Sequence, residues 1–189
     1  MLKQEFLHVA RRYPVAAAIK TYEDGLEALD AEVALLFLLK GNAFDMQPFI
    51  EEAHRKGKGI VIHIDLIGGV GKDRAGIQYL HRIGADAIVT SKSQLVAAGK
   101  AEGLVTIQRL LLLEDSALDK GVKTIAHARP DLVEVLPGII FADIAPQLQK
   151  LLPGPFIAGG FIQSHDEVEQ VRRAGAILCT SSTPTLWRP

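Results

Sequence analysis

Hydrophobic residues recur along the chain in short runs that are apolar at consecutive positions rather than at alternate ones. Such runs are typical of strands that are covered on both faces, as in a parallel sheet. The segments between them place apolar residues at helical spacing, for example at Met46, Phe49, Ile50 and Ala53, and several end in a glycine. The pattern predicts eight strands, at 15–20, 33–40, 59–66, 87–91, 104–113, 132–136, 156–160 and 176–181.

Alternation of strands and helices predicts a parallel sheet of the α/β class, and eight such units predict a compact (β/α)8 TIM barrel with short helices. The chain of 189 residues is near the lower end, ~200 residues, of the sizes known for that fold. A doubly wound open sheet is the structural alternative. We expect one domain over residues 1–189, in which 1–13 form a lead-in helix that covers the barrel bottom or a partner. The first connection is expected to be short and the last barely helical.

The composition limits the classes of function. With 21 Lys and Arg against 22 Asp and Glu, the formal net charge is -1, so no global positive field attracts nucleic acid and any RNA contact must be local. The only cysteine, Cys179, excludes an internal disulfide and a CxxC metal or redox motif. No apolar run approaches the ~18 residues of a membrane span. We therefore expect a cytoplasmic protein with no membrane contact and no metal.

Polar residues end the first six predicted strands, and in a barrel all strand carboxyl ends meet where ligands bind. Because side chains alternate, His63 and Asp65 are expected to share a face, as are Thr106 and Gln108, and we expect both pairs to point into the barrel mouth. A buried Asp65 or Glu134 needs a cationic partner. Singly, these residues also fit solvated strand ends, a loop cap or a hydrogen-bonded core histidine. The set comprises Lys20, Lys40, His63, Asp65, Lys92, Gln108, Arg109 and Glu134.

The seventh and eighth predicted strands end in small residues instead. Gly159 and Gly160 let backbone amides approach a ligand closely, while Ser181 and Ser182 add hydroxyl groups and amides. A helix is expected to start just beyond, near 164–166. The loops after strands seven and eight are the recurrent phosphate site of this fold, where amides and a helix N-terminus hold the anion without needing a cation. The two loops together predict a phosphate site, with a glycine turn and a serine N-cap as the alternative.

A third glycine-rich segment, DLIGGVGKDRAG at 65–76, follows the third predicted strand. It lacks the Walker spacing of P-loop proteins and the third glycine of a dinucleotide fingerprint. A mobile loop that carries Lys72 and Arg74 as a lid or a partner contact fits better, and a merely solvated loop is the alternative.

Six segments, taken in order, closely resemble the glycerol-3-phosphate-responsive transcription antiterminator family of bacterial glycerol-uptake operons. The resemblance covers nearly the whole chain, and TIQR followed by EVLPG and IAGG is more specific than any one glycine motif. The segments are HIDLIGGVGKDRAG (63–76), IVTSKSQLV (88–96), TIQRLLLLEDSAL (106–118), VEVLPGII (133–140), IAGGFI (157–162) and TSSTPTLW (180–187).

The resemblance implies a TIM barrel without catalysis or cofactor that senses glycerol 3-phosphate. The protein would then bind and stabilise a leader mRNA so that transcription passes a terminator. The phosphate is expected against Gly159, Gly160, Ser181 and Ser182. The glycerol end is expected near a second set of residues, which are Asp65, Lys92, Gln108, Arg109 and Glu134.

The expected RNA contacts are Lys72 and Arg74, on a loop that the ligand orders, and we expect a homodimer although no residue pattern demands one. A rival interpretation is a barrel enzyme acting on a phosphorylated three-carbon or sugar substrate. There Lys92 would serve as nucleophile or acid, or Asp65 and Glu134 as the proton-transfer pair with His63 assisting. A third is a degenerate barrel that binds a phosphometabolite and recruits a protein.

Overall fold

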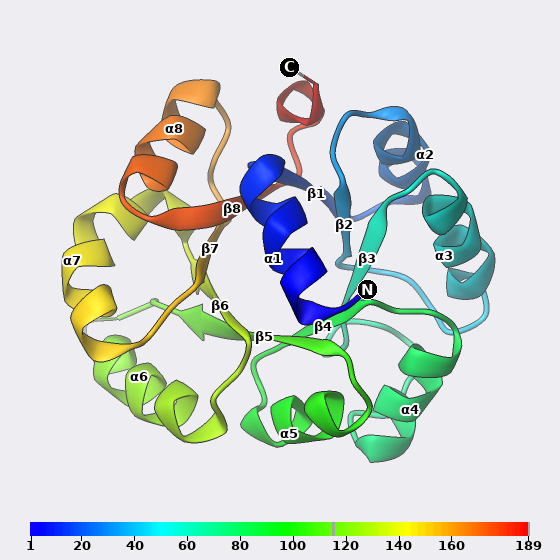
Figure 1. The fold of residues 1–189 in the computed structure, drawn as a ribbon, viewed down its shortest axis with the longest axis horizontal. Coiled ribbons are helices and arrows are strands. Elements are labelled where there is room, and N and C mark those ends of the chain that lie inside the picture. Colours follow the sequence, from blue (N-terminus) through cyan, green and yellow to red (C-terminus); the bar gives the residue numbers. More distant parts are fainter. Residues whose placement is uncertain (115, 189) are drawn as a thin grey trace.

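The structure is a computed structural model that describes residues 1–114 and 116–188, and it shows a closed barrel of eight parallel strands. Each strand pairs with the next along the chain, and the eighth pairs with the first, which confirms the predicted TIM barrel (Figure 1). The strands are β1 (Val15–Ile19), β2 (Leu35–Leu38), β3 (Gly59–His63), β4 (Ala87–Thr90), β5 (Val105–Leu111), β6 (Leu132–Leu136), β7 (Phe156–Gly159) and β8 (Ala176–Ser181).

Helices surround the barrel, and one more lies across its end (Figure 1). The outer helices are α2 (Tyr22–Asp30), α3 (Met46–Arg55), α4 (Arg74–Arg82), α5 (Ser93–Ala101), α6 (Ser116–Ala128), α7 (Phe141–Leu151) and α8 (His165–Arg173). Two 3-10 helices, η1 (Gly138–Ile140) and η2 (Pro184–Trp187), complete the set, and η2 occupies the gap between α8 and α2. Both expectations about the connections were wrong. The first connection, from β1 to β2, holds the nine-residue α2, and the last, from β7 to β8, holds the nine-residue α8.

Side-chain caps fix where several outer helices begin, and so where the strand-to-helix loops end. The Thr21 hydroxyl accepts a hydrogen bond from the amide of Asp24 at 3.1 Å, the Asp73 carboxylate from Gly76 at 2.9 Å, and the Ser164 hydroxyl from Glu167 at 3.3 Å. Each cap satisfies an amide that has no partner inside the helix. The loops after β1, β3 and β7 are therefore held where they join α2, α4 and α8.

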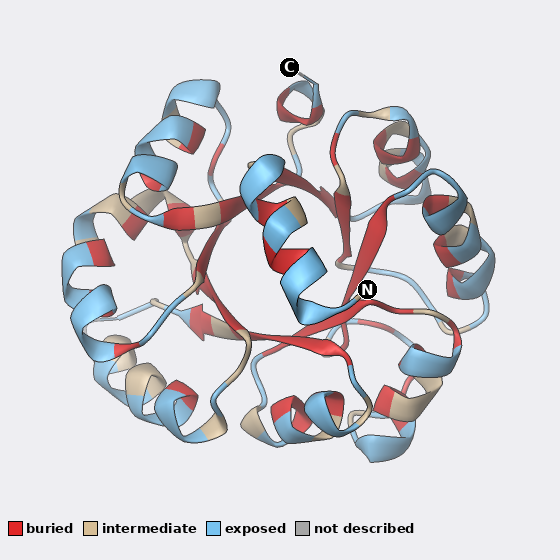
Figure 2. Ribbon diagram, in the orientation of Figure 1, coloured by how far each residue is buried: buried red, intermediate tan, exposed pale blue. Residues whose placement is uncertain are grey.

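The amino-terminal helix α1 (Lys3–Arg12) closes the amino end of the barrel. Phe6, Leu7 and Ala10 are buried against side chains from the barrel interior, among them Phe37 and Ile107. Figure 2 shows the buried face of α1 turned toward the strands and its exposed face turned to solvent. A second apolar core lies between the strands and the outer helices. Because packed side chains fill the interior, ligand access is confined to the carboxyl end.

Within the described ranges, 1–114 and 116–188, no helix has the length and apolar character needed to cross a bilayer.

Candidate functional site

A cavity of about 340 Å³ lies at the carboxyl end of the barrel, and we call it the mouth cavity. Its volume is in the range of roughly 300–1,000 Å³ that small-molecule sites have. Polar side chains from β1, β5, β6 and β8 meet there with the loop after β7. The principal lining residues are Lys20, Arg109, Glu134 and residues 160–163 and 180–183.

The floor of the mouth cavity is organised around the buried carboxylate of Glu134. Arg109 Nε donates to Glu134 Oε2 at 2.8 Å, and Thr180 Oγ1 donates to Glu134 Oε1 at 3.0 Å. The expectation that Glu134 pairs with a cation is confirmed. A Cβ atom at Gly159 would lie 2.6 Å from Thr180 Oγ1 and 2.8 Å from Glu134 Oε1, so glycine is needed to leave room for this network.

The wall of the cavity is formed by the two loops in which the phosphate site was predicted. Gly160 has a φ of +83° and Phe161 a φ of 62°, and in the described part of the chain neither amide donates a hydrogen bond, nor does that of Ser182. Ser181 Oγ donates to the Ile162 carbonyl at 2.8 Å and so ties the two loops together. The structure thus brings Gly160, Ser181 and Ser182 to one cavity.

Lys20 completes this wall, and sequence reasoning left it out of the phosphate site. Its ammonium donates to Ser182 Oγ at 2.9 Å across 162 positions of sequence. Because strands β1 and β8 pair in the closed barrel, the residue that directly follows β1 meets the residue that directly follows β8. The only signal in the sequence was a lysine directly after a strand. The site thus contains a cation, which the prediction did not require.

The start of α8 offers fewer free amides than the prediction assumed, because those of Gln163, Ser164 and Glu167 are used within the chain. Glu167 Oε2 accepts hydrogen bonds from the amides of Gln163 at 2.7 Å and Ser164 at 3.0 Å. The Gln163 amide, with the groups of Ser164, holds the pKa of the Glu167 carboxyl below its ordinary value. A carboxylate of the chain therefore binds the two amides that lead into α8, because the helix begins with a capping box.

The prediction that Thr106 and Gln108 point into the barrel mouth is wrong. Gln108 Nε2 donates to the hydroxyl of Ser93 in α5 at 3.0 Å, and Thr106 Oγ1 donates to Asp131 at 2.8 Å. Both side chains are buried on the helix side of β5. Alternation then turns Arg109 inward. Polar partners on the neighbouring segments make this outward burial stable, and Gln108 does not reach the predicted glycerol end.

Asp65 and Lys92 lie at the carboxyl ends of β3 and β4, outside the principal lining of the mouth cavity. Asp65 accepts hydrogen bonds from Thr90 Oγ1 at 2.9 Å and from the amide of Ser91 at 2.7 Å. The expectation of a cationic partner is wrong for Asp65, because a hydroxyl and an amide satisfy its oxygens. The Lys92 side chain is exposed at the N-cap of α5.

His63 is buried, and neither ring nitrogen has a hydrogen-bond partner among the residues that the structure describes. Burial, together with the charge of Arg109, lowers the pKa of His63 to about 4. The ring is therefore neutral near pH 7. It is neither a hydrogen-bonded core histidine nor a base poised near neutral pH. No group of three or more His, Cys, Asp or Glu in the described residues is arranged to hold a metal ion.

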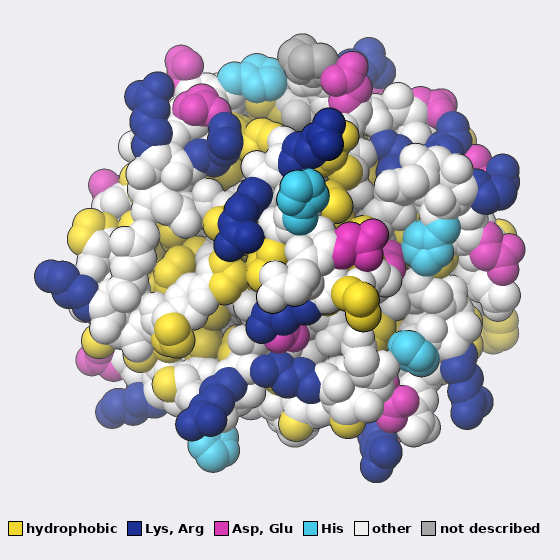
Figure 3. Space-filling view, in the orientation of Figure 1, with side chains coloured by type: hydrophobic (Ala, Val, Ile, Leu, Met, Phe, Trp, Pro, Cys, Tyr) yellow, Lys and Arg dark blue, Asp and Glu magenta, His cyan; other side chains and the backbone are white. Residues whose placement is uncertain are grey.

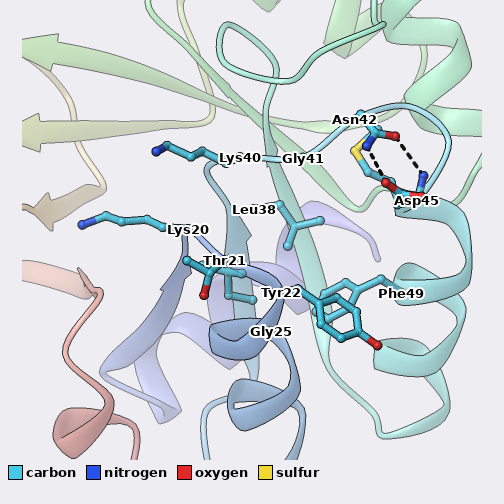
Figure 4. A pocket seen from close by; sticks show the side chains of 12 residues that line it. Lys20, Thr21, Tyr22, Gly25, Leu38, Lys40, Gly41, Asn42, Asp45 and Phe49 are labelled. Atoms are coloured by element: carbon cyan, nitrogen blue, oxygen red, sulfur yellow. Dashed lines mark hydrogen bonds between the residues drawn. The ribbon is translucent and has the colours of Figure 1, made fainter.

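A smaller hollow of about 210 Å³ adjoins the mouth cavity between α2 and α3, and Lys20 lines both. Tyr22, Leu38 and Phe49 make it largely apolar. Figure 4 shows that Lys20 and Lys40 extend side by side, away from Tyr22 and Phe49. Lys20 therefore lies between the two cavities, whereas Lys40 lines the hollow alone.

The two residues predicted to contact RNA already have partners within the chain. Lys72 Nζ donates to the carbonyl of Ile67, and Arg74 Nε lies 3.6 Å from a Glu102 carboxylate oxygen. Neither residue lines the mouth cavity.

Comparisons with known proteins find relatives over nearly the whole chain. A family model described as glycerol-3-phosphate responsive antiterminator matches residues 15–187. The uncharacterised protein YgcP of Escherichia coli (strain K12) is 29% identical over 182 residues, which cover 96% of this chain and 95% of YgcP.

Two solved structures are similar over most of their length. A glycerol uptake operon antiterminator regulatory protein from Listeria monocytogenes has a TM-score of 0.86 and 31% identity, covering 92% of this chain and 94% of the Listeria chain. A glycerol uptake operon antiterminator-related protein from Thermotoga maritima has a TM-score of 0.81 and 25% identity, covering 93% of this chain and 98% of the other.

Proposed function

The chain belongs to the family of glycerol-3-phosphate responsive antiterminators, and from this membership we propose a ligand-controlled RNA-binding function. Glycerol 3-phosphate binds in the mouth cavity. The liganded protein then binds and stabilises the leader mRNA of a glycerol operon, so that transcription continues past a terminator.

The observation that carries the ligand part is the convergence of Lys20, Gly160 and Ser182 on one cavity. A phosphate dianion there meets the Lys20 ammonium group, the Ser182 hydroxyl and backbone amides that the described part of the chain does not use. Charge-assisted hydrogen bonds of this kind are roughly twice as strong as neutral ones. Arg109, held by Glu134, stands at the floor, where the glycerol hydroxyls can reach it.

The contacts in the mouth do not favour the rival barrel enzyme. Glu134 is committed to Arg109 and Thr180, and Asp65 to Thr90 and Ser91, so the two carboxylates serve separate networks. A proton-transfer pair needs groups within reach of one substrate atom and with pKa values near the working pH. His63, with a pKa of about 4, does not meet the second condition.

Substitution of Gly160 tests the ligand site. Gly160→Glu should abolish glycerol 3-phosphate binding in calorimetry, because its carboxylate enters the space of the phosphate; the nearest side-chain atom to a Cβ there is 3.6 Å away. Gly160→Ala is the matched control, since it carries the same backbone cost of roughly 1 kcal/mol at positive φ without the charge. Unchanged affinity in Gly160→Glu would place the ligand elsewhere.

The regulatory part is tested by a gel shift on leader RNA with and without glycerol 3-phosphate. We expect the ligand to increase RNA retention and to remain chemically unchanged after prolonged incubation with the protein. Turnover of glycerol 3-phosphate by catalytic amounts of protein would instead support the enzyme.

A further inference from the structure

We propose that the RNA is bound by the rim of the barrel mouth, where unpaired bases stack on Phe44 and Phe161 and the RNA backbone contacts Lys40 and Lys92. We call these four residues the mouth rim. The inference rests on the proposed function, because it takes RNA as the partner, and it adds the surface and the mode of contact.

Phe44 is displayed on a loop that is fixed by hydrogen bonds. Its side chain is 89% exposed, although a phenyl ring gains free energy on burial. Asn42 Oδ1 accepts from the Phe44 amide at 2.8 Å, and the Ala43 amide donates to the Gly68 carbonyl at 3.0 Å. The loop after β2 is thereby tied to the loop after β3, so the ring is held outward on an ordered support.

Phe161 is displayed in the same way on the loop after β7. The ring is 74% exposed, and the φ of 62° is in the left-handed region, where a non-glycine residue costs roughly 1–2 kcal/mol. The neighbours on both sides are anchored, because Gly160 O accepts from the Gly138 amide at 3.1 Å and Ile162 O accepts from Ser181 Oγ. A strained backbone that exposes a large ring points to a functional contact.

The lysines of this end are not neutralised by the chain. Within residues 1–114 and 116–188, neither Lys40 nor Lys92 lies within salt-bridge distance of a carboxylate, and both are exposed. Many nearby carboxylates are instead engaged by backbone amides, hydroxyls or Arg109; these are Asp24, Asp65, Asp73, Glu134 and Glu167. Aromatic rings with unpaired cations are the combination that binds single-stranded nucleic acid, by stacking and phosphate contact.

The opposite face is the competing surface, and Figure 3 looks directly onto it. Lys and Arg side chains there are interspersed with carboxylates and histidines. Several are paired, as Lys3 is with Asp131 at 2.9 Å and Arg172 with Glu169 at 2.8 Å. Its one partly exposed aromatic ring of the α1 segment, Tyr13, lies beside Arg12. That face thus has cations, but its ring is only 37% exposed, against 89% for Phe44 and 74% for Phe161.

The mouth rim also explains how ligand binding can affect RNA binding, because the two sites adjoin. Phe161 follows Gly160, and both residues line the mouth cavity. A phosphate bound to the Gly160 loop and to Ser182 holds the backbone that carries the ring. The ligand then raises the RNA affinity. The size of the increase is set by how much more tightly the ligand binds the base-stacking conformation of this loop than the other conformations.

The test measures RNA and ligand affinity separately in Phe44→Ala and Phe161→Asn. Asparagine is chosen because it tolerates positive φ while removing the ring. With saturating glycerol 3-phosphate, each variant should bind leader RNA roughly 5- to 100-fold more weakly, the loss expected for one stacked base. Calorimetric affinity for glycerol 3-phosphate should be unchanged in Phe44→Ala. The double variant Arg11→Ala, Arg12→Ala on the opposite face is the matched control and should retain RNA.

The lysines are tested by the salt dependence of the same RNA complex. Replacing Lys40 and Lys92 with alanine should lower the slope of log affinity against log salt by about 1.4, since each single-strand phosphate contact contributes roughly 0.7.

Each remaining outcome overturns a definite part of the proposal. Loss of RNA in the Arg11, Arg12 variant with full retention in both Phe variants would move the interface to the α1 end and leave the proposed function intact. If the Phe variants change the mass measured by light scattering but not RNA affinity, the rings bind a second protein copy instead. If the unaltered protein binds glycerol 3-phosphate but never RNA, the proposed function itself fails.

Discussion

Glu134 is the residue on which the mouth cavity depends most directly. It is 1% exposed, and its two oxygens accept hydrogen bonds from Arg109 and Thr180. The glycine at position 159 leaves the space that this arrangement needs. The position of Arg109, and with it the floor of the mouth cavity, therefore follows from one buried carboxylate.

Glu134→Gln should lower the free energy of unfolding by about 3 kcal/mol, because Arg109 keeps its charge and loses its buried partner. Urea denaturation measures this change. Glu114→Gln, at a side chain that is 67% exposed, is the control and should change stability by less than about 0.5 kcal/mol. Equal effects in the two variants would contradict the central role of Glu134.

His63 should make the protein less stable as the pH falls from 6.5 to 4. The folded-state pKa is about 4 and the ordinary value is 6.5, so in this window the unfolded chain binds the additional proton. The contribution present above pH 6.5 is then lost, and it amounts to roughly 3 kcal/mol in total. Urea denaturation at a series of pH values measures this loss.

His63→Leu is the comparison for that pH series, since no hydrogen bond of the described ring is lost with it. The difference in unfolding free energy between the two proteins should change across pH 4 to 6.5 and be constant above. A constant difference at all pH values would show that His63 has the same pKa in the folded and unfolded states.

Among the elements, α1 has a role distinct from that of the seven helices around the barrel. It lies across the amino end, and Phe6 is fully buried among side chains of the barrel interior (Figure 2). Phe6→Ala should therefore destabilise the protein by about 3–5 kcal/mol in urea denaturation, the usual cost of removing a buried phenyl ring. Glycerol 3-phosphate affinity at native conditions should be unchanged, because the mouth cavity is at the other end; a large loss of affinity would contradict this separation.

The strands were predictable from sequence because burial on both faces requires a run of apolar residues, and such a run can be recognised within a short stretch of sequence. Residues 132–136 and 176–181 match β6 and β8 at both ends, and the other strands differ only at their ends. Whether a residue at a strand end belongs to the strand depends on its hydrogen-bond partners in other strands.

It was harder to predict which face of the sheet each polar side chain occupies, because this also depends on partners from other parts of the chain. Gln108 and Thr106 are buried outward because Ser93 and Asp131 supply partners there, which no periodicity shows. The contact of Lys20 with Ser182 spans 162 positions and exists only because the barrel closes. Glycine and serine at the ends of the last two strands were informative, since they mark where backbone can approach a ligand.

The two ends of the barrel differ in how far they are closed. One end is sealed by α1, and the other carries the mouth cavity and the mouth rim. A net charge of -1 conceals this arrangement, because the unpaired lysines gather at the mouth while nearby carboxylates are engaged by amides.

Glycerol 3-phosphate should stabilise the entire barrel, since strands from both ends of the sequence form its site. At a ligand concentration of one hundred times Kd, the free energy of unfolding should rise by about 2.7 kcal/mol in a single transition. Differential scanning calorimetry measures the shift, and Gly160→Glu should show none. A shift of equal size in that variant would mean that the ligand acts at another site.

The contact between Trp187 and Ser181 equips the protein with an optical reporter. The chain contains one tryptophan, which is buried, and its indole Nε1 donates to the Ser181 carbonyl at 2.9 Å. Ser182, next along the chain, meets Lys20 at the mouth. Intrinsic fluorescence of the unlabelled protein therefore originates beside the loop that is expected to grip the phosphate, and its emission can follow ligand occupancy without any dye.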